Sequence, residues 1–272
     1  MRYKFPKLDD SLNVTKTNPI QEFITYSLGI CLVIALIFYA SIFIVDLIVP
    51  HVSLETEHRI WNSLLKDSAF TQGGKRDAKV IATEKYLQRL LDRIPKNDVM
   101  KYDYRVILVN RPEINAVALP SGKIVVYSGL LNILKSENAI LFVLGHELGH
   151  FAHRDHLRGM GRSLITSTFL MLLFSSDGNL SSFSNLSTHF HLQFSRDQEN
   201  AADEAGLEAL MKTYGHAGGA TDFFSYMAKH RHMGFLDKYQ STHPVSQERI
   251  AHMKDIIARE KLPVLQTLPK EM

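Results

Sequence analysis

The segment Val143–His156 reads VLGHELGHFAHRDH and decides how the rest of the chain is interpreted. Residues four apart lie on the same face of a helix, so His146 and His150 are expected to point the same way and to bind one metal ion. Glu147 follows the first of these histidines, where it can reach a water molecule on that ion. The pattern predicts a zinc site, and a solvent-exposed pair of histidines on a helix is the alternative.

A catalytic zinc ion needs a third protein ligand and leaves a fourth position open for water. Glu199 lies about fifty residues downstream in the segment Ser195–Gly206, SRDQENAADEAG, which is predicted to be helical. Asp203 is one turn later on the same face, where it can accept the outer N–H of a ligating histidine. An acidic, solvent-facing helix would account for these two residues alone. Combined with the histidine pair, they favour zinc.

One segment is predicted to lie in a membrane. Phe23–Val45 has 23 residues and no charge, and such a helix spans a hydrocarbon core of about 30 Å. The run is too long for the apolar part of a signal peptide, and it lacks the polar stripe of a core helix. We therefore expect a membrane anchor at residues 23–49 after a short cytoplasmic tail at residues 1–22. The tail carries more basic residues than the stretch after the span, which places the large C-terminal part across the membrane.

The composition is that of an ordinary globular protein. The chain has 272 residues, 45% hydrophobic and 22% charged, and a formal net charge of +3. This charge is too small to indicate a nucleic-acid partner, so none is expected. The single cysteine, Cys31, excludes an internal disulfide and a cysteine-rich zinc module.

The remainder of the chain predicts an α+β domain with long helices around a small sheet. The sheet is expected to contain a hairpin, and its strand at 123–127 is expected to offer an edge for an extended peptide. The apolar stretch Leu164–Phe174 is too short to cross a bilayer, so we expect a buried helix; a surface that dips into the bilayer is the alternative. Other helices are expected at 54–65, 77–94, 137–153 and 196–214, strands at 104–109 and 123–127, a turn at 71–75, and a Ser/Asn-rich loop at 175–187.

Several segments together resemble the family of membrane-associated zinc metallopeptidases that includes HtpX and the CAAX prenyl endopeptidase. Three segments occur in the family's order, and a fourth, weaker one follows: Asn115–Leu131, Gly145–Arg154, Ser195–Asp203 and Thr242–Ile250. The resemblance covers about Leu54 to Ala258. Asp155 departs from the family, where many members have histidine. The single anchor also departs from the several membrane spans of those relatives, which disfavours prenylated substrates.

The resemblance implies a mainly helical, gluzincin-like metallopeptidase domain at residues 54–258, followed by a C-terminal tail at 259–272. It implies one Zn²⁺ per chain held by His146, His150 and Glu199, with Glu147 as general base and acid. His243 resembles a family histidine that approaches the metal, where it stabilises the transition state or blocks the open position; a capping role before Pro244 is the alternative. Arg249 is expected to be an internal brace, and His153 and His156 to be ordinary helix-end residues.

The expected function is that of a membrane-anchored zinc endopeptidase. Its partners would be the lipid bilayer and protein or peptide substrates, namely exported, membrane or misfolded proteins. The expected location is a bacterial inner membrane, with the catalytic domain on the periplasmic side. Two alternatives remain: a catalytically silent, zinc-stabilised membrane scaffold or chaperone, and a zinc hydrolase that acts on a small molecule.

Overall fold

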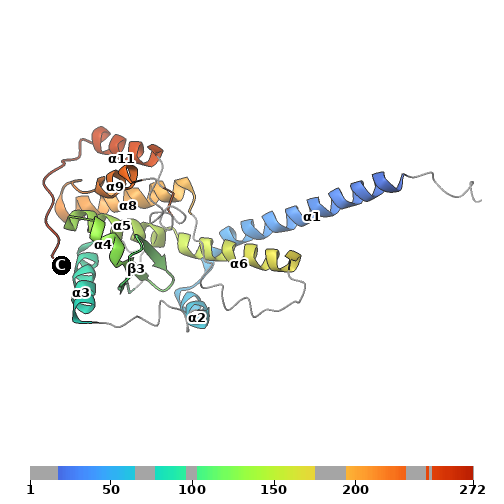
Figure 1. Cartoon of the computed structure of the whole chain (residues 1–272), viewed down its shortest axis with the longest axis horizontal. Coiled ribbons are helices and arrows are strands. Elements are labelled where there is room, and N and C mark those ends of the chain that lie inside the picture. Colours follow the sequence, from blue (N-terminus) through green and yellow to red (C-terminus); the bar gives the residue numbers. More distant parts are fainter. Residues whose placement is uncertain are drawn as a thin grey trace, which may run out of the picture.

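A computed structural model of the chain describes residues 18–64, 77–95, 103–174, 194–230, 243–244 and 247–271. The turn predicted at 71–75, the loop predicted at 175–187 and residues 1–17 of the predicted tail lie outside these ranges. The described part is mainly helical with a small sheet, so the predicted α+β class is confirmed (Figure 1). In chain order its elements are α1 (Pro19–Ile48), η2 (Val49–His51), α2 (Leu54–Leu64), α3 (Ala78–Arg93), β1 (Arg105–Val109), β2 (Ala116–Leu119), β3 (Lys123–Tyr127), α4 (Ser128–Ile133), α5 (Glu137–Ala152), α6 (Asp155–Phe174), α8 (Arg196–Tyr214), α9 (Asp222–Lys229) and α11 (Gln247–Arg259).

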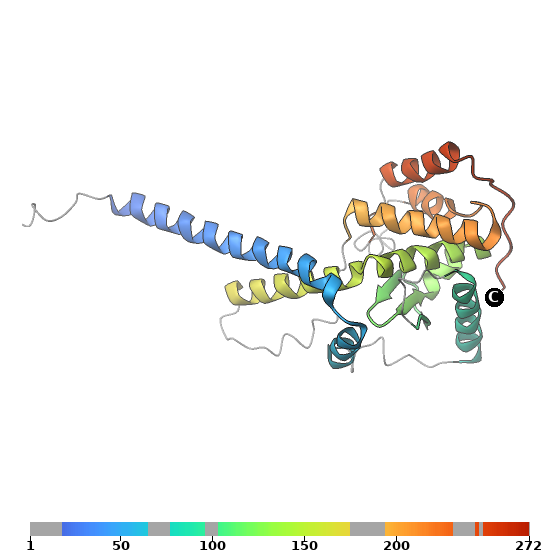
Figure 2. The same ribbon diagram turned by 180° about the vertical axis from the view of Figure 1, so that it is seen from behind.

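Helix α1 projects from the rest of the molecule (Figures 1 and 2). It begins at an Asn18 N-cap, whose side chain accepts the N–H of Ile20, and Pro19 occupies its first turn. With the following 3₁₀ turn it is long and apolar enough to cross a membrane, and its most apolar stretch is entirely unburied. A helix that exposes this much apolar surface needs an apolar environment around it.

The sheet has the strand order β1-β3-β2. β1 pairs with β3 in parallel, and β2 pairs with β3 in an antiparallel hairpin. The expectation that residues 123–127 offer an edge is therefore wrong, because β3 is the central strand and β2 is at an edge. The hairpin loop contains Ser121 and Gly122 at positive φ. The strained serine is held in place because Glu57 from α2 accepts its backbone N–H at 2.7 Å.

Helices α5 and α8 form the centre of the domain. Residues Glu137–Phe151 of α5 are all buried, so this helix has no solvent-exposed face before its last residue. The two helices approach closely through glycine: an added Cβ at Gly149 would lie 2.8 Å from the Cα of Ala202, and one at Gly206 would lie 2.8 Å from the carbonyl oxygen of Phe142. The sheet packs on α5 through alternate residues, with Ile124 and Val126 in the main core.

Helix α6 differs from its prediction. The stretch Leu164–Phe174 is helical as expected, but it is not buried in the core, because Leu164 and Leu170 are exposed. α6 lies instead beside α1, and the rings of Phe38 and Phe169 are 4.9 Å apart (Figure 1). The prediction failed because an apolar run of this length does not reveal whether protein or another apolar medium surrounds it.

The C-terminal segment after α11 returns to the start of α5. The backbone N–H of Glu137 donates to the carbonyl of Leu268, and Lys270 donates to the carbonyl of Leu131. The side chain of Asn138 accepts the N–H of Leu268 at 2.8 Å. These contacts fix the segment against the N-terminal end of the central helix.

Candidate metal centre

Four buried side chains converge between α5, α8 and the segment before α11. His146, His150, Glu199 and His243 each offer a ligand atom, and these atoms all lie within 4.8 Å of one another. The first three were expected from their spacing, and the structure brings them together. His243, which was expected only from the resemblance, joins them through its Nδ1 atom.

Local sequence signals place the donors from α5 and α8. Ser136 caps α5, so the helix starts in register to put His146 and His150 on one face. Ser195 and Gln198 form a reciprocal capping box at the start of α8, which positions Glu199 within its first turn. The left-handed Gly215 ends this helix at the predicted residue.

The donor geometry fits a small tetrahedral ion. Bonds of about 2.0–2.2 Å to a tetrahedral zinc ion separate neighbouring ligand atoms by about 3.3–3.6 Å. The Nε2 atoms of His146 and His150 are 3.2 Å apart, and each lies 3.6–3.7 Å from a carboxylate oxygen of Glu199. The Nδ1 atom of His243 is 3.4 Å from the Nε2 atom of His146. The residues present therefore suit a zinc ion.

A carboxylate orients each histidine of the pair. Asp203 Oδ1 lies 2.8 Å from His146 Nδ1, the contact expected from the sequence. Asp155 Oδ2 lies 3.1 Å from His150 Nδ1, a contact that was not anticipated. Both contacts place a proton on Nδ1 and leave Nε2 free to bind a metal. Asp155 was missed because Arg154, at φ 56°, turns the chain so that the next side chain returns to the cluster.

Arg249 braces the carboxylates that contact the histidines. Its guanidinium contacts Glu199 Oε2 at 2.6 Å and both oxygens of Asp203 at 2.8 Å, and it is buried. The internal brace expected at this position is present. Burial would raise the pKa of Glu199, but the charge and hydrogen bond of His243, with the charges of His146 and Arg249, hold it well below its usual range.

Glu147 is buried beside the cluster. Its Oε1 atom is 3.8 Å from His243 Nε2. Burial raises the pKa of Glu147 above its usual value, and the charges of His243 and His150 offset only part of this effect. A carboxylate with a raised pKa is suited to accept a proton and then return it.

A second buried contact connects the cluster region to the segment after α1. His156, expected to be an ordinary helix-end residue, is fully buried, and its Nε2 atom lies 3.2 Å from Glu57 Oε1. That expectation is wrong for His156, whereas His153 does cap the end of α5 with its Nδ1 atom 3.1 Å from the Gly149 carbonyl. The partner on α2 is almost one hundred residues away, so local sequence carried no signal for it.

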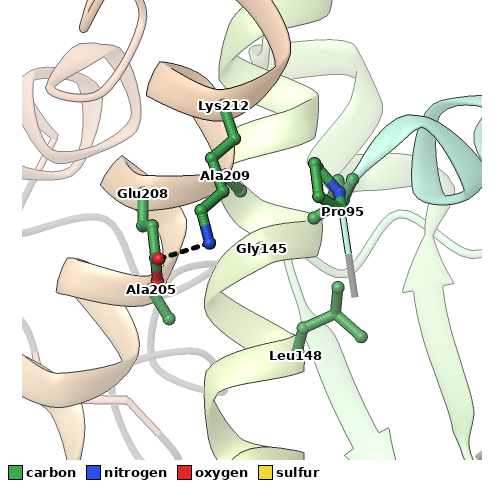
Figure 3. A pocket seen from close by; sticks show the side chains of 8 residues that line it. Pro95, Gly145, Leu148, Ala205, Glu208, Ala209 and Lys212 are labelled. Atoms are coloured by element: carbon green, nitrogen blue, oxygen red, sulfur yellow. Dashed lines mark ion pairs between the residues drawn. The ribbon is translucent and has the colours of Figure 1, made fainter. Parts of the chain in front are cut away.

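A separate hollow lies between the other faces of α5 and α8. Figure 3 shows Gly145 and Leu148 on one side of it and Glu208 and Lys212 on the other, with an ion pair of 2.6 Å between the last two. Its lining includes none of the four clustered donors. This hollow is therefore distinct from the candidate metal centre.

The sequence comparisons agree with the geometry. The model of peptidase family M48 matches residues 81–257. The chain is 31% identical to the mitochondrial metalloendopeptidase OMA1 of Arabidopsis thaliana, over 69% of this chain and 36% of that protein. It is 31% identical to the metalloprotease LoiP of Escherichia coli, over 56% of this chain and 62% of LoiP. It is 30% identical to the metalloprotease YcaL of Escherichia coli, over 69% of this chain and 71% of YcaL.

The match extends from α3 to α11 and so includes every donor of the cluster. The chain nevertheless spans less than two-thirds of the length of the OMA1 proteins it matches, with 36% covered in Arabidopsis thaliana and 62% in Schizosaccharomyces pombe. The family model covers more than half of this chain. The chain belongs to peptidase family M48.

Proposed function

We propose that this protein is a membrane-anchored endopeptidase with one zinc ion per chain, held by His146, His150 and Glu199. The observation that carries the proposal is the 3.2 Å separation of the two Nε2 atoms, with a Glu199 oxygen within 3.7 Å of each and Glu147 alongside. Such an ion, when bound, lowers the pKa of a water molecule and polarises a carbonyl group. Membership of a peptidase family supports peptide bonds as the target.

In this proposal Glu147 moves the proton. Its carboxylate accepts a proton from the water that attacks the scissile carbonyl and then gives that proton to the leaving amine. Its burial and its position near the cluster support this role. Asp203 and Asp155 hold the two histidine rings in orientation, and Arg249 holds the Glu199 carboxylate.

We further propose that His243 gates the site. Its Nδ1 atom lies 2.9 Å from Glu199 and 3.4 Å from His146, so it occupies the fourth corner of the donor set. A zinc site with four protein ligands is closed, whereas catalysis needs a position for water. His243 must therefore withdraw before water can enter, and it can stabilise the transition state from its withdrawn position. The capping role before Pro244 has less support, because the imidazole points into the cluster.

The proposed substrates are exported, membrane or misfolded proteins. A catalytic domain attached to α1 meets such proteins at the membrane surface. We propose that α1 anchors it in a bacterial inner membrane with the metal centre on the periplasmic side, which the four basic residues of the N-terminal tail support. OMA1 relatives named as mitochondrial make a mitochondrial membrane the alternative. Protease protection of a tag at either terminus, measured in membranes of the native host, shows on which side of the membrane the catalytic domain lies.

The full chain, purified in detergent, should cleave an unfolded casein, and a zinc chelator should abolish cleavage. Glu147→Gln should retain one equivalent of zinc by elemental analysis and lose activity by about 10²–10⁴-fold. Glu208→Gln, an exposed change on α8, is the matched control and should behave like the parent.

The same assay addresses the two alternatives. If Glu147→Gln preserves the biological role in cells, the scaffold or chaperone function is correct. If the chain hydrolyses small esters or amides but not casein, it is a small-molecule hydrolase. A folded sample that binds no metal contradicts the proposal as a whole.

A further inference from the structure

Helices α1 and α6 pack side by side in opposite directions. Three contacts define the alignment: two lie at the start of α6 and the end of α1, and the third lies two turns later in α6 and two turns earlier in α1. Arg162 contacts Asp46, the position of an added Cβ at Gly161 lies 2.7 Å from Val45, and the ring of Phe169 contacts that of Phe38. Helix α6 therefore runs from the catalytic domain along the same direction in which α1 leaves it (Figure 2).

The change from charged to apolar sequence occurs at the same level on both helices. Asp46 is the first charge after the uncharged run of α1, and Arg162 is the last charge before the uncharged end of α6. These two side chains form an ion pair in which one guanidinium nitrogen lies 2.7 Å from each carboxylate oxygen. Arg158 adds a contact at 3.6 Å to the same carboxylate. The paired charges form a collar, and beyond it α1 is uncharged back to Phe23 and α6 is uncharged to its end at Phe174.

Beyond this collar the two helices share the features of lipid-exposed helices. Leu170 is 50% exposed and Leu164 is 38% exposed, which is unfavourable in water. The hydroxyl of Thr166 donates to the carbonyl of Arg162, as that of Ser41 does to Ile37 on α1. Polar groups in hydrocarbon need such internal partners, because no water is available there.

We propose that the apolar half of α6, Leu164–Phe174, lies among the acyl chains of the bilayer that holds α1. This inference rests on the anchoring role of α1 given under the proposed function. Twelve residues separate Arg162 from Phe174, or about 18 Å of helix, which reaches roughly the middle of a 30 Å core without crossing it. α6 is thus a second membrane element that enters from the same side as the catalytic domain.

Lipid is the occupant that the observations favour. The exposed apolar surface of α6 lies beside that of α1, and the paired charges of Arg162 and Asp46 mark the domain end of both uncharged runs. The immersion of α6 also fixes the distance between the metal centre and the membrane. Asp155, which contacts His150, precedes the collar by seven residues, or about 10 Å of helix. With two elements in the bilayer, the catalytic domain cannot swing away from the membrane as it could on a single anchor.

The test is depth-dependent fluorescence quenching in liposomes that contain the full chain. A Cys31→Ala background carries one NBD-labelled cysteine at either Leu164→Cys or Leu170→Cys. Nitroxide lipids labelled at a shallow or a deep acyl position are added in parallel. We expect the deep nitroxide to quench position 170 by about twofold more than the shallow one, and the reverse order at position 164, because six residues, about 9 Å of helix, separate the two sites.

Two controls separate this proposal from the anchor itself. The native Cys31, labelled in the parent chain, reports the position of α1 in lipid. Ala258→Cys, exposed on α11, reports a position in water and should be quenched by aqueous iodide.

If the nitroxide lipids quench Cys31 but iodide quenches position 170, α6 lies in water and the proposal is wrong while the anchor stands. If position 170 escapes both quenchers, a second copy of the chain covers it, and the proposal is equally wrong. If Cys31 itself escapes lipid quenching, the anchor fails. Labelled variants must retain the parent's zinc content, so that misfolded samples are excluded.

Discussion

Two pairs of adjacent helices, α5–α8 and α1–α6, use similar residues for opposite purposes. Both pairs contain a long apolar stretch and a glycine at the contact, and each includes carboxylates that pair with an arginine. In α5–α8 the apolar residues face protein and the charged groups are buried: Glu199 and Asp203 of α8, and Arg249, which reaches them from α11, are each no more than 2% exposed. In α1–α6 the apolar residues face outward, and the side chains of Arg162 and Asp46 are each 35% exposed.

This difference distinguishes the helix pair that carries the candidate metal centre from the helix pair that supports the domain. Buried charges are costly unless each has a partner, so the α5–α8 pair holds a rigid, fully specified arrangement of polar groups. The α1–α6 pair has no such requirement, since its charges lie where the apolar runs end. The following changes test this comparison, beginning with the largest expected effect.

Arg249→Met should destabilise the fold by about 3–5 kcal/mol, because it leaves the buried carboxylates of Glu199 and Asp203 without their cation. Arg196→Met removes an exposed ion pair with Glu248 and should cost at most about 1 kcal/mol. Chemical denaturation of metal-free protein in detergent measures both values. Equal effects of the two changes would mean that burial of the brace is not important.

Gly149→Ala should destabilise the chain by about 1–3 kcal/mol, because the new methyl group would lie 2.8 Å from the Ala202 backbone and push α5 from α8. Gly29→Ala is the matched control on α1, where no atom of the described residues lies within 4 Å of the added methyl group, and it should be neutral. Thermal unfolding and zinc content report the effect. A neutral Gly149→Ala would show that the two central helices can separate without loss of the site.

Asp155→Ala should weaken zinc binding by about 10–100-fold, because it removes the hydrogen bond that orients His150. Competition with a fluorescent zinc chelator measures the affinity. Asp197→Ala, an exposed change on the first turn of α8, should leave the affinity unchanged. If Asp155→Ala binds zinc as tightly as the parent, the Asp155 carboxylate serves only the junction between α5 and α6 and does not orient His150.

Substitution of Glu137, at the start of α5, should have a smaller effect on stability, and this effect should depend on pH. Burial would raise its pKa, but hydrogen bonds from Tyr214 and Arg93 and the charge of Arg93 outweigh burial and lower the pKa. Its contribution to stability is therefore complete above the unfolded pKa of about 4.3 and is lost as the pH falls through the lower folded value. Metal-free parent protein should exceed Glu137→Gln in stability near neutral pH, and the difference should shrink below about pH 4. A constant difference would contradict this assignment.

Local sequence predicted much of the helical part of the fold. Ser136 and Gly215 mark helix ends that the structure places where expected, and Pro95 follows the end of α3 closely. Caps and turns act within a few residues, so their signals are legible without tertiary information. The parallel pairing of β1 with β3 was not predicted, because pairing between distant strands is set by packing on α5 and not by neighbouring residues.

By itself the sequence determined the elements with local causes: an uncharged helix of membrane length, and a helix that aligns His146 with His150. Helical periodicity and capping suffice for both. Only the tertiary structure decided which distant groups meet, namely Asp155 with His150, Glu57 with His156, His243 with Glu199, and α6 with α1. Side chains far apart in the chain are brought together by core packing and by a turn at Arg154, and neither leaves a periodic pattern in the sequence.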